Sequence, residues 1–305
     1  MYILYNSALR NTDREVEGVG SIYFRIINLI AFCRYHNLEF LHYKHHIGHN
    51  YNNMDENEWD TKWDNLFNIG AMCKKLEDIE NVDNYKIIKY NGLQYIPLYD
   101  DEKEMIKNND VIFDNIIINK NNDVLCYITH NTEIYKKHAN EYLKLVEDDI
   151  LKVYNEANIN KPLIFDKNKK NIAIHIRVWN DWDAVCDKYE EYINSSILKH
   201  ALNENQYHHI ISKLINKFPD YDIHIFSQPS FITKYPNIYN NKNLNFHFDM
   251  DALDSMHHLI NADVLVLGYS TFSFLAGIYN KNTVIYTYYP YIHKLMDRWI
   301  NFNEI

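Results

Sequence analysis

The stretch DVLVLGYSTFSFLAGIYNKNTVIYTY, residues 263–288, has the clearest local pattern in the chain. It opens with alternating Val and Leu that end at Gly268, continues with helical spacing over 271–280, and closes with β-branched and aromatic side chains over 283–288. A strand, a helix and a second strand in this order form the crossover of a parallel sheet. The stretch therefore predicts an α/β domain.

The same alternation of strands and helices precedes this stretch. The expected elements, in chain order, are a strand at 171–178, a helix at about 204–218, a strand at 222–227 and a helix at about 251–260. Together they predict a Rossmann-like domain over residues 165–290. Residues 291–305, which follow it, are expected to form a closing helix.

The N-terminal half begins in a similar way. Its readable elements are a strand at 2–5, a helix at 22–37, a strand at 38–43 and a helix at 131–156. Residues 47–122 mix Asn-rich loops with short strands, so boundaries there are poorly defined. We expect a first Rossmann-like domain over residues 1–160, and an α/β protein whose two domains face a central cleft.

Composition narrows the classes of partner. The chain has 305 residues, 47% of them apolar, which is enough for two cores at roughly 100–200 residues per domain. The formal net charge is −10, and no block of Lys and Arg has the density that a phosphate backbone requires. We therefore expect no nucleic acid as a partner.

Other patterns exclude further classes of site and location. The cysteines form no CxxC pair and are expected to be reduced; they are Cys33, Cys73, Cys126 and Cys186. His45, His46 and His49 lie in a loop without carboxylate or thiol partners, so we expect no metal site. The N-terminus lacks a signal-peptide layout, and no transmembrane segment is evident. These features favour a soluble, cytoplasmic protein.

The first candidate site is HIRVWND, residues 175–181, where an apolar strand runs into a loop. Arg177 at such a strand end is suited to fork-like bonds with phosphate oxygens. The alternative is a structural ion pair with Asp181 or Asp183. His175 points to the same face of the sheet and is either a contact residue or a hydrogen-bonded core histidine.

The second candidate site is the turn that starts the helix at 271–280. A helix N-terminus offers unpaired backbone N–H groups and a positive dipole to an anion. The turn contains Ser270, Thr271, Phe272 and Ser273. Its hydroxyl groups suit a diphosphate, and the alternative is ordinary N-capping.

Acidic residues open the preceding helix. Asp249, Asp251 and Asp254 are placed to accept bonds from ribose hydroxyls or a guanine edge, although acids in a first turn are favoured by the helix dipole alone. Of the three, only Asp249 is favoured as a ligand contact over this alternative.

A glycine-containing segment precedes the first helix. Gly18, Gly20 and Ser21 lie where glycines allow a ligand to approach the backbone and the helix N-terminus. Arg25 follows one turn later, where it either faces the cleft or, as we expect, lies at the surface.

Taken in order, these segments resemble the fucosyltransferase superfamily, which includes α1,2-, α1,6- and protein O-fucosyltransferases. The matching segments are GVGS (18–21), HIRVWND (175–181), FSQ (226–228), DAL (251–253) and STFS (270–273). Two positions depart from the family pattern: Val178 stands in place of a second Arg, and Asn180 in place of Gly or Thr.

The resemblance implies a GT-B fold and metal-independent, inverting transfer of fucose from GDP-fucose to a hydroxyl of a glycan or glycoconjugate, with no cofactor. It implies that Arg177 stabilises the β-phosphate, helped by the hydroxyl-rich turn, and that the N-terminal domain lies on the acceptor side. The nearest carboxylates for a catalytic base are Asp181 and Asp183, with Glu190 and Glu191 as reserves.

Two other functions compete with this one. The same fold may use another GDP-, UDP- or dTDP-sugar, or the protein may bind a glycan or nucleotide without catalysis. A Rossmann oxidoreductase is disfavoured, because the first loop lacks a tight GxGxxG and no acid ends the second strand, where Tyr43 and Lys44 stand.

Overall fold

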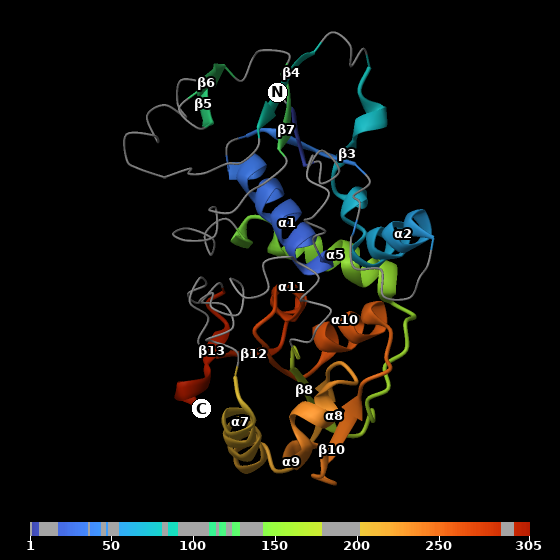
Figure 1. Ribbon diagram of the computed structural model, residues 1–305. Coiled ribbons are helices and arrows are strands. Elements are labelled where there is room, and N and C mark those ends of the chain that lie inside the picture. Colours follow the sequence, from blue (N-terminus) through green and yellow to red (C-terminus); the bar gives the residue numbers. More distant parts are fainter. Residues whose placement is uncertain are drawn as a thin grey trace. The chain divides into compact units, whose positions relative to one another are not determined.

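The computed structural model divides into two compact units, Met1–Asn160 and Lys161–Ile305 (Figure 1). The structure describes residues 2–5, 18–35, 37–43, 47, 55–80, 85–90, 110–113, 116–119, 124–128, 143–178, 202–287 and 296–305. Several residues singled out above lie outside these ranges: Asp181, Asp183, Glu190, Glu191, His45, His46, His49 and Cys186. The two units are described separately below.

Unit 2, residues 161–305, contains a six-stranded parallel sheet. Its strands are β8 (Lys170–His175), β9 (Tyr221–Phe226), β10 (Leu244–His247), β11 (Val264–Val266), β12 (Thr283–Tyr286) and β13 (Trp299–Asn301). They lie in the order β10-β9-β8-β11-β12-β13. Numbered along the chain this is 3-2-1-4-5-6, the Rossmann order, and it reverses direction between β8 and β11.

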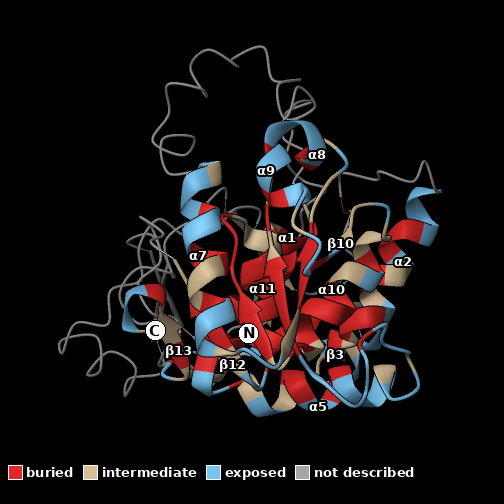
Figure 2. Cartoon of the chain, turned by 90° about the horizontal axis from the view of Figure 1, so that it is seen from below, coloured by how far each residue is buried: buried red, intermediate tan, exposed pale blue. Residues whose placement is uncertain are grey.

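One face of this sheet is an apolar core. It is covered by α7 (Glu204–Lys217), α8 (Phe231–Lys234) and α9 (Pro236–Tyr239), whose buried side chains join those of β8 and β9 in one hydrophobic cluster. The helix α7 starts at a capping box, in which Gln206 N donates to Asn203 Oδ1 at 3.0 Å and Asn203 N to Gln206 Oε1 at 2.8 Å. Its outer side is exposed, as Figure 2 shows.

The opposite face of β8, β9 and β10 includes buried polar side chains. Asn171 and His224 alternate with the apolar residues and so point away from that core. The ring of His224 has its Nε2 3.2 Å from Asn171 Oδ1 and its Nδ1 3.0 Å from His247 Nε2. Burial, and secondarily the charge of neighbouring imidazoles, lowers the pKa of both His224 and His247 to about 4. The two rings are therefore neutral near pH 7.

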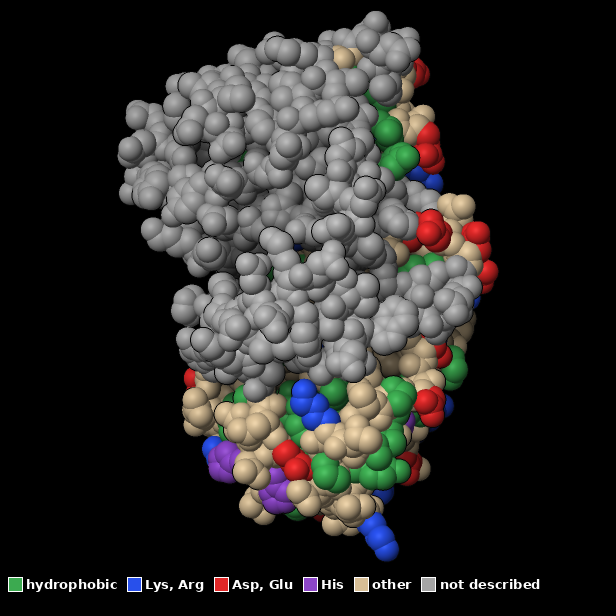
Figure 3. Space-filling model, viewed as in Figure 1, with side chains coloured by type: hydrophobic (Ala, Val, Ile, Leu, Met, Phe, Trp, Pro, Cys, Tyr) green, Lys and Arg blue, Asp and Glu red, His purple; other side chains and the backbone are tan. Residues whose placement is uncertain are grey.

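Two longer helices complete unit 2: α10 (Ala252–Asn261) and α11 (Thr271–Tyr279). They pack against each other, and α11 is buried along most of its length (Figure 2). On the drawn face of unit 2, the described surface mixes acidic, basic, apolar and histidine side chains without one large basic field (Figure 3).

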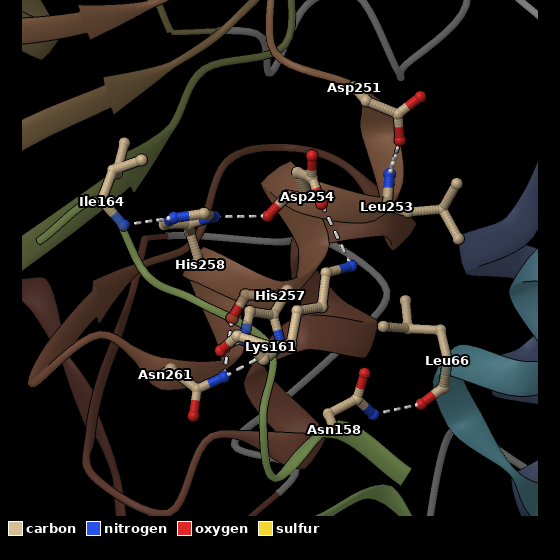
Figure 4. Close-up of polar contacts among 10 residues, drawn as sticks. All are labelled: Leu66, Asn158, Lys161, Ile164, Asp251, Leu253, Asp254, His257, His258 and Asn261. Atoms are coloured by element: carbon tan, nitrogen blue, oxygen red, sulfur yellow. Dashed lines mark hydrogen bonds and ion pairs between the residues drawn. The ribbon is translucent and has the colours of Figure 1, made fainter.

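The segment that begins unit 2 is held on α10 (Figure 4). Lys161 Nζ lies 3.1 Å from Asp254 Oδ1, and Ile164 N donates to His258 Nε2 at 2.9 Å. The other ring nitrogen, His258 Nδ1, lies 2.6 Å from the carbonyl oxygen of Asp254. Since a carbonyl only accepts, Nδ1 carries the proton and Nε2 is the acceptor, so His258 is neutral.

The closing helix expected at 291–305 is not found in the described part of that range. Residues 299–301 form β13, which pairs in parallel with β12, and Phe302–Glu304 form a 3-10 turn, η6. Trp299 is 1% exposed and packs on Phe274, and Arg298 donates to the carbonyl oxygens of Asn280 (3.0 Å) and Ile278 (2.8 Å) at the end of α11. These contacts with distant residues outweigh the local helical spacing.

Unit 1 contains a five-stranded parallel sheet in the order β3-β2-β1-β7-β4. Its strands are β1 (Tyr2–Tyr5), β2 (Glu39–His42), β3 (Lys74–Lys75), β4 (Lys86–Tyr90) and β7 (Val124–Ile128). The strands β5 (Asp110–Phe113) and β6 (Ile116–Asn119) form a separate antiparallel hairpin. The helices are α1 (Val19–Tyr35), α2 (Glu56–Phe67) and α5 (Glu147–Asn158), with 3-10 turns η2 (Ile69–Ala71) and η3 (Leu76–Asp78).

Helix α1 is buried around most of its circumference. The expectation that Arg25 lies at the surface is wrong: its side chain is 8% exposed, and its Nη1 donates to the hydroxyl of Tyr5 at 3.2 Å. The end of α5 is held within the same unit by Asn158, whose Nδ2 donates to Leu66 O at 2.7 Å (Figure 4). Among the described helices, none has both the length and the apolar content to cross a membrane.

Candidate functional site: the carboxyl edge of the sheet in unit 2

The candidate site lies where the strand order of unit 2 reverses. In an open parallel sheet, ligands bind outside the carboxyl ends of the two strands that flank this point. Here these strands are β8, which ends at His175, and β11, which leads through Leu267 to Gly268. The structure therefore brings together the two segments that the sequence singled out, one around Arg177 and one around Ser270.

Gly268 sets how closely the two segments approach. A Cβ atom at this position would lie 2.3 Å from the carbonyl oxygen of His175 and 3.1 Å from its Nδ1. No side chain fits at such a distance. The loop after β11 can therefore lie directly against the end of β8 only because residue 268 is glycine.

Helix α11 begins at this point. Ser270 is its N-cap, and its Oγ accepts a hydrogen bond from Phe272 N at 3.2 Å. Ser270 N donates to Gly268 O at 2.8 Å, which tightens the turn. The first turn of α11 thus presents backbone N–H groups and the positive end of its dipole at the carboxyl edge, with Ser270 and Thr271 half-buried there.

Ser273 plays a different part from the one the sequence suggested. It is fully buried, and its Oγ lies 3.2 Å from Gly268 O and 3.1 Å from Ser270 O. Since both atoms are carbonyl oxygens, the single hydroxyl proton of Ser273 is used inside the turn. Ser273 therefore supports the loop that carries Gly268 and Ser270, and its side chain is not open to a ligand.

His175 and Arg177 form the other side of the site. Burial, and next the positive charge of Arg177, lowers the pKa of His175 to about 3, so its ring is neutral at physiological pH. The ring packs against Phe272 with 5.4 Å between centroids. Its buried Nδ1 has no hydrogen-bond partner in the described part of the chain. Arg177 is half-buried and carries a permanent positive charge at this edge.

The three aspartates near α10 divide into two kinds. Asp251 is the N-cap of α10, where its Oδ1 accepts from Leu253 N at 2.7 Å (Figure 4). Asp254 pairs with Lys161. Both have structural roles, as the helix-dipole alternative predicted. Asp249 lies exposed in the bend after β10, and no described contact assigns it a structural role.

The glycine-containing segment belongs to unit 1. Helix α1 already starts at Val19, so Gly20 and Ser21 lie in its first turn and do not precede it. Ser21 N donates to Gly18 O at 3.0 Å. Gly18 is the described residue at the entrance to that helix, and Gly20 is buried.

The sequence did not single out the end of β9 as part of the site, although it contains the FSQ segment. Ser227 Oγ donates to Ile176 O at 2.7 Å and ties this end to the end of β8. Beyond it, Gln228 Oε1 and Ser230 Oγ are buried without a hydrogen-bond partner among the described residues. The sequence signals were the FSQ segment of the resemblance and the polar residues directly after an apolar strand.

Within the described residues, no three His, Cys, Asp or Glu side chains are grouped so as to hold a metal ion. No protein-family model matches the sequence, and no curated protein matches it. Solved structures do match. POFUT1 in complex with GDP-fucose has a TM-score of 0.50 and 11% identity, with 100% of this chain and 98% of that chain covered. The chain has the GT-B fold.

A second crystal form of POFUT1 with GDP-fucose gives a TM-score of 0.50 at 12% identity, covering 99% of this chain and 98% of that one. E. coli heptosyltransferase WaaC with ADP-2-deoxy-2-fluoro heptose matches at a TM-score of 0.42 and 9% identity, covering 99% and 92%. The predicted fold class, an α/β protein with two Rossmann-like domains of the GT-B type, is confirmed. At these identities the likeness concerns the fold alone.

Proposed function

We propose that this protein is a glycosyltransferase that binds a nucleoside diphosphate sugar at the carboxyl edge of unit 2, with GDP-fucose as the donor. The observation that carries the proposal is the pairing enforced at Gly268. It places the cationic end of β8 against the N-terminus of α11, which are two anion-binding elements of different kinds. The GT-B fold and its likeness to POFUT1 with bound GDP-fucose support the choice of donor.

The proposed roles follow from the chemistry of each group. Arg177 and the first-turn amides of α11 neutralise the charge that develops on the diphosphate as it leaves. Neutral His175 offers a hydrogen bond without adding charge. Transfer is proposed to be inverting and metal-independent, toward a hydroxyl of a glycan or glycoconjugate, with Asp181 or Asp183 as the base.

Calorimetric titration with GDP, UDP and dTDP, first without metal and then with magnesium, tests the proposal. We expect micromolar GDP binding without metal. Hydrogen bonds to charged groups contribute about 1.5–3 kcal/mol each, so Arg177→Ala should weaken GDP at least about tenfold, and Arg177→Lys should restore it only in part.

The matched control is Lys242→Ala, which removes the same charge. Lys242 is exposed and precedes β10, so it lies at the amino edge of the sheet, away from the site. Equal weakening by Lys242→Ala and Arg177→Ala would show a general charge effect and contradict the proposed site. A preference for UDP or dTDP would keep the diphosphate site and replace the donor.

Catalysis needs its own measurement. Release of GDP from GDP-fucose in the presence of acceptor glycans is expected for the wild type and should fall with Arg177→Ala. A wild-type protein that binds GDP but is no more active than this variant would indicate a non-catalytic nucleotide-binding protein.

A further inference from the structure

Two polar side chains lie just beyond the end of β9. Gln228 Oε1 and Ser230 Oγ are both buried, and neither has a hydrogen-bond partner among the described residues. Ser230 precedes α8 but makes no side-chain capping bond to it. Buried polar atoms are nearly always paired, and leaving one unpaired costs free energy. Since neither atom has a partner in the described part of the chain, a bound ligand would supply the missing hydrogen bonds.

Their position puts them beside the proposed diphosphate site. The strands β8 and β9 pair in parallel with His175 opposite Phe226. Gln228 therefore follows the end of β9 at the same distance in sequence as Arg177 follows the end of β8. The contact from Ser227 Oγ to Ile176 O, at 2.7 Å, holds the two strand ends together at this point.

The remaining question is which part of a donor would reach β9. A diphosphate held between β8 and β11 continues into a nucleoside on one side and a sugar on the other. In dinucleotide-binding sheets of this order, an acidic side chain at the end of the second strand bonds a ribose hydroxyl. The second strand of this sheet is β9. Just beyond it lie the amide of Gln228 and the hydroxyl of Ser230. Both groups can accept bonds from ribose hydroxyls without repelling a diphosphate.

We propose that Gln228 and Ser230 bind the ribose hydroxyls of the nucleoside diphosphate and so orient the nucleoside across the end of β9. This assignment rests on the proposed function, because it takes the diphosphate to lie at the carboxyl edge. The ribose contact is additional to the contacts proposed for the diphosphate and for the transferred sugar.

Calorimetry with three probes separates the ribose contact from the phosphate contact. The probes are GDP, its 2′,3′-dideoxy analogue and inorganic diphosphate, and the variants are Gln228→Met and Ser230→Ala. Each variant is expected to weaken GDP about 5- to 50-fold, since it leaves a buried ribose hydroxyl unsatisfied, and to leave inorganic diphosphate within about twofold of wild type. Because the analogue lacks the hydroxyls, its affinity should change little in either variant.

Two controls frame the result. Arg177→Ala should weaken all three probes, and Ser212→Ala, on α7, should weaken none. Without nucleotide, Gln228→Met and Ser230→Ala should melt at the wild-type temperature or above, because each removes a buried atom that has no hydrogen-bond partner among the described residues.

The outcomes distinguish this inference from the proposed function. If GDP and inorganic diphosphate bind the wild type but both variants bind GDP as tightly as wild type, the ribose contact is wrong and the diphosphate site stands. Equal weakening of GDP and its dideoxy analogue also overturns the ribose contact. If the wild type binds neither GDP nor inorganic diphosphate, the proposed function and this inference fall together.

Discussion

Replacing Gly268 by Ala is expected to damage both the stability of unit 2 and its affinity for nucleotide. The added Cβ would lie 2.3 Å from His175 O, whereas ordinary contact begins at 3.4 Å, so the two segments must separate by about 1 Å. The opposing atom belongs to the backbone of a central strand and cannot turn aside as a side chain would. Overpacking of this kind costs about 1–3 kcal/mol, and we expect the upper end of that range.

The loss is measurable by thermal unfolding and by calorimetry. For a unit of this size, about 3 kcal/mol corresponds to a fall in Tm of about 6–12 °C. Because the shift separates the end of β8 from the first turn of α11, GDP affinity should fall about tenfold or more in the same variant.

Gly277→Ala is the matched control in the same unit. Its Cβ would lie 2.9 Å from the ring edge of Trp299, which is the far end of a side chain, and the change improves helix propensity within α11. We expect a smaller fall in Tm and unchanged GDP affinity. A Gly268→Ala protein with the Tm and affinity of wild type would refute the close approach of the two segments.

Three further predictions concern the surroundings of the site. Since His224 and His247 have folded pKa values of about 4 and an ordinary unfolded value of 6.5, the unfolded chain binds more protons between these limits. The free energy of unfolding should therefore fall as pH drops from about 6.5 to 4. In the double variant His224→Gln/His247→Gln this fall should be shallower, which chemical denaturation at a series of pH values measures. Ser273→Ala, which removes a buried donor, should lower stability by about 1 kcal/mol in thermal melts yet change GDP affinity by less than about threefold; strong loss of binding at unchanged Tm would mean that Ser273 contacts the ligand. Asp251→Ala should cost about 1 kcal/mol through loss of the α10 cap, whereas Asp249→Ala should leave the melting temperature unchanged, and denaturant titration of the two variants checks the contrast.

Local pattern was sufficient wherever an element is long or ends in a recognisable turn. The apolar run of β11, the Ser cap of α11 and the Asn–Gln capping box of α7 are all visible in the sequence, and each element forms near its expected place. Arg177 and Ser270 each follow the end of a predicted parallel strand. Because the carboxyl ends of parallel strands meet at one edge of a sheet, the sequence placed both residues at that edge.

Other elements depend on contacts that the local sequence does not show. The short strand β10 precedes the acidic turn and is defined by pairing with β9. The helix α2 lies within residues 47–122, where we predicted Asn-rich loops and short strands. Its signals were the Asp55 cap, which accepts from Glu58 N at 3.1 Å, and the buried aromatic residues at spacings of four: Trp59, Trp63 and Phe67. The burial of Gln228 Oε1 away from any partner among the described residues depends on the fold, so no motif could have revealed it.

The polar groups at the carboxyl edge fall into two sets that should respond differently to substitution. Ser227 and Ser273 donate to carbonyl oxygens and hold the strand ends in place. Gln228, Ser230 and the Nδ1 of His175 are buried without partners among the described residues, and we assign them to the ligand. Loss of a group in the first set removes a bond from the folded chain and should lower Tm. Loss of Gln228 or Ser230 should instead lower GDP affinity at unchanged Tm, so parallel melting and titration of both sets tests whether this edge is built for binding.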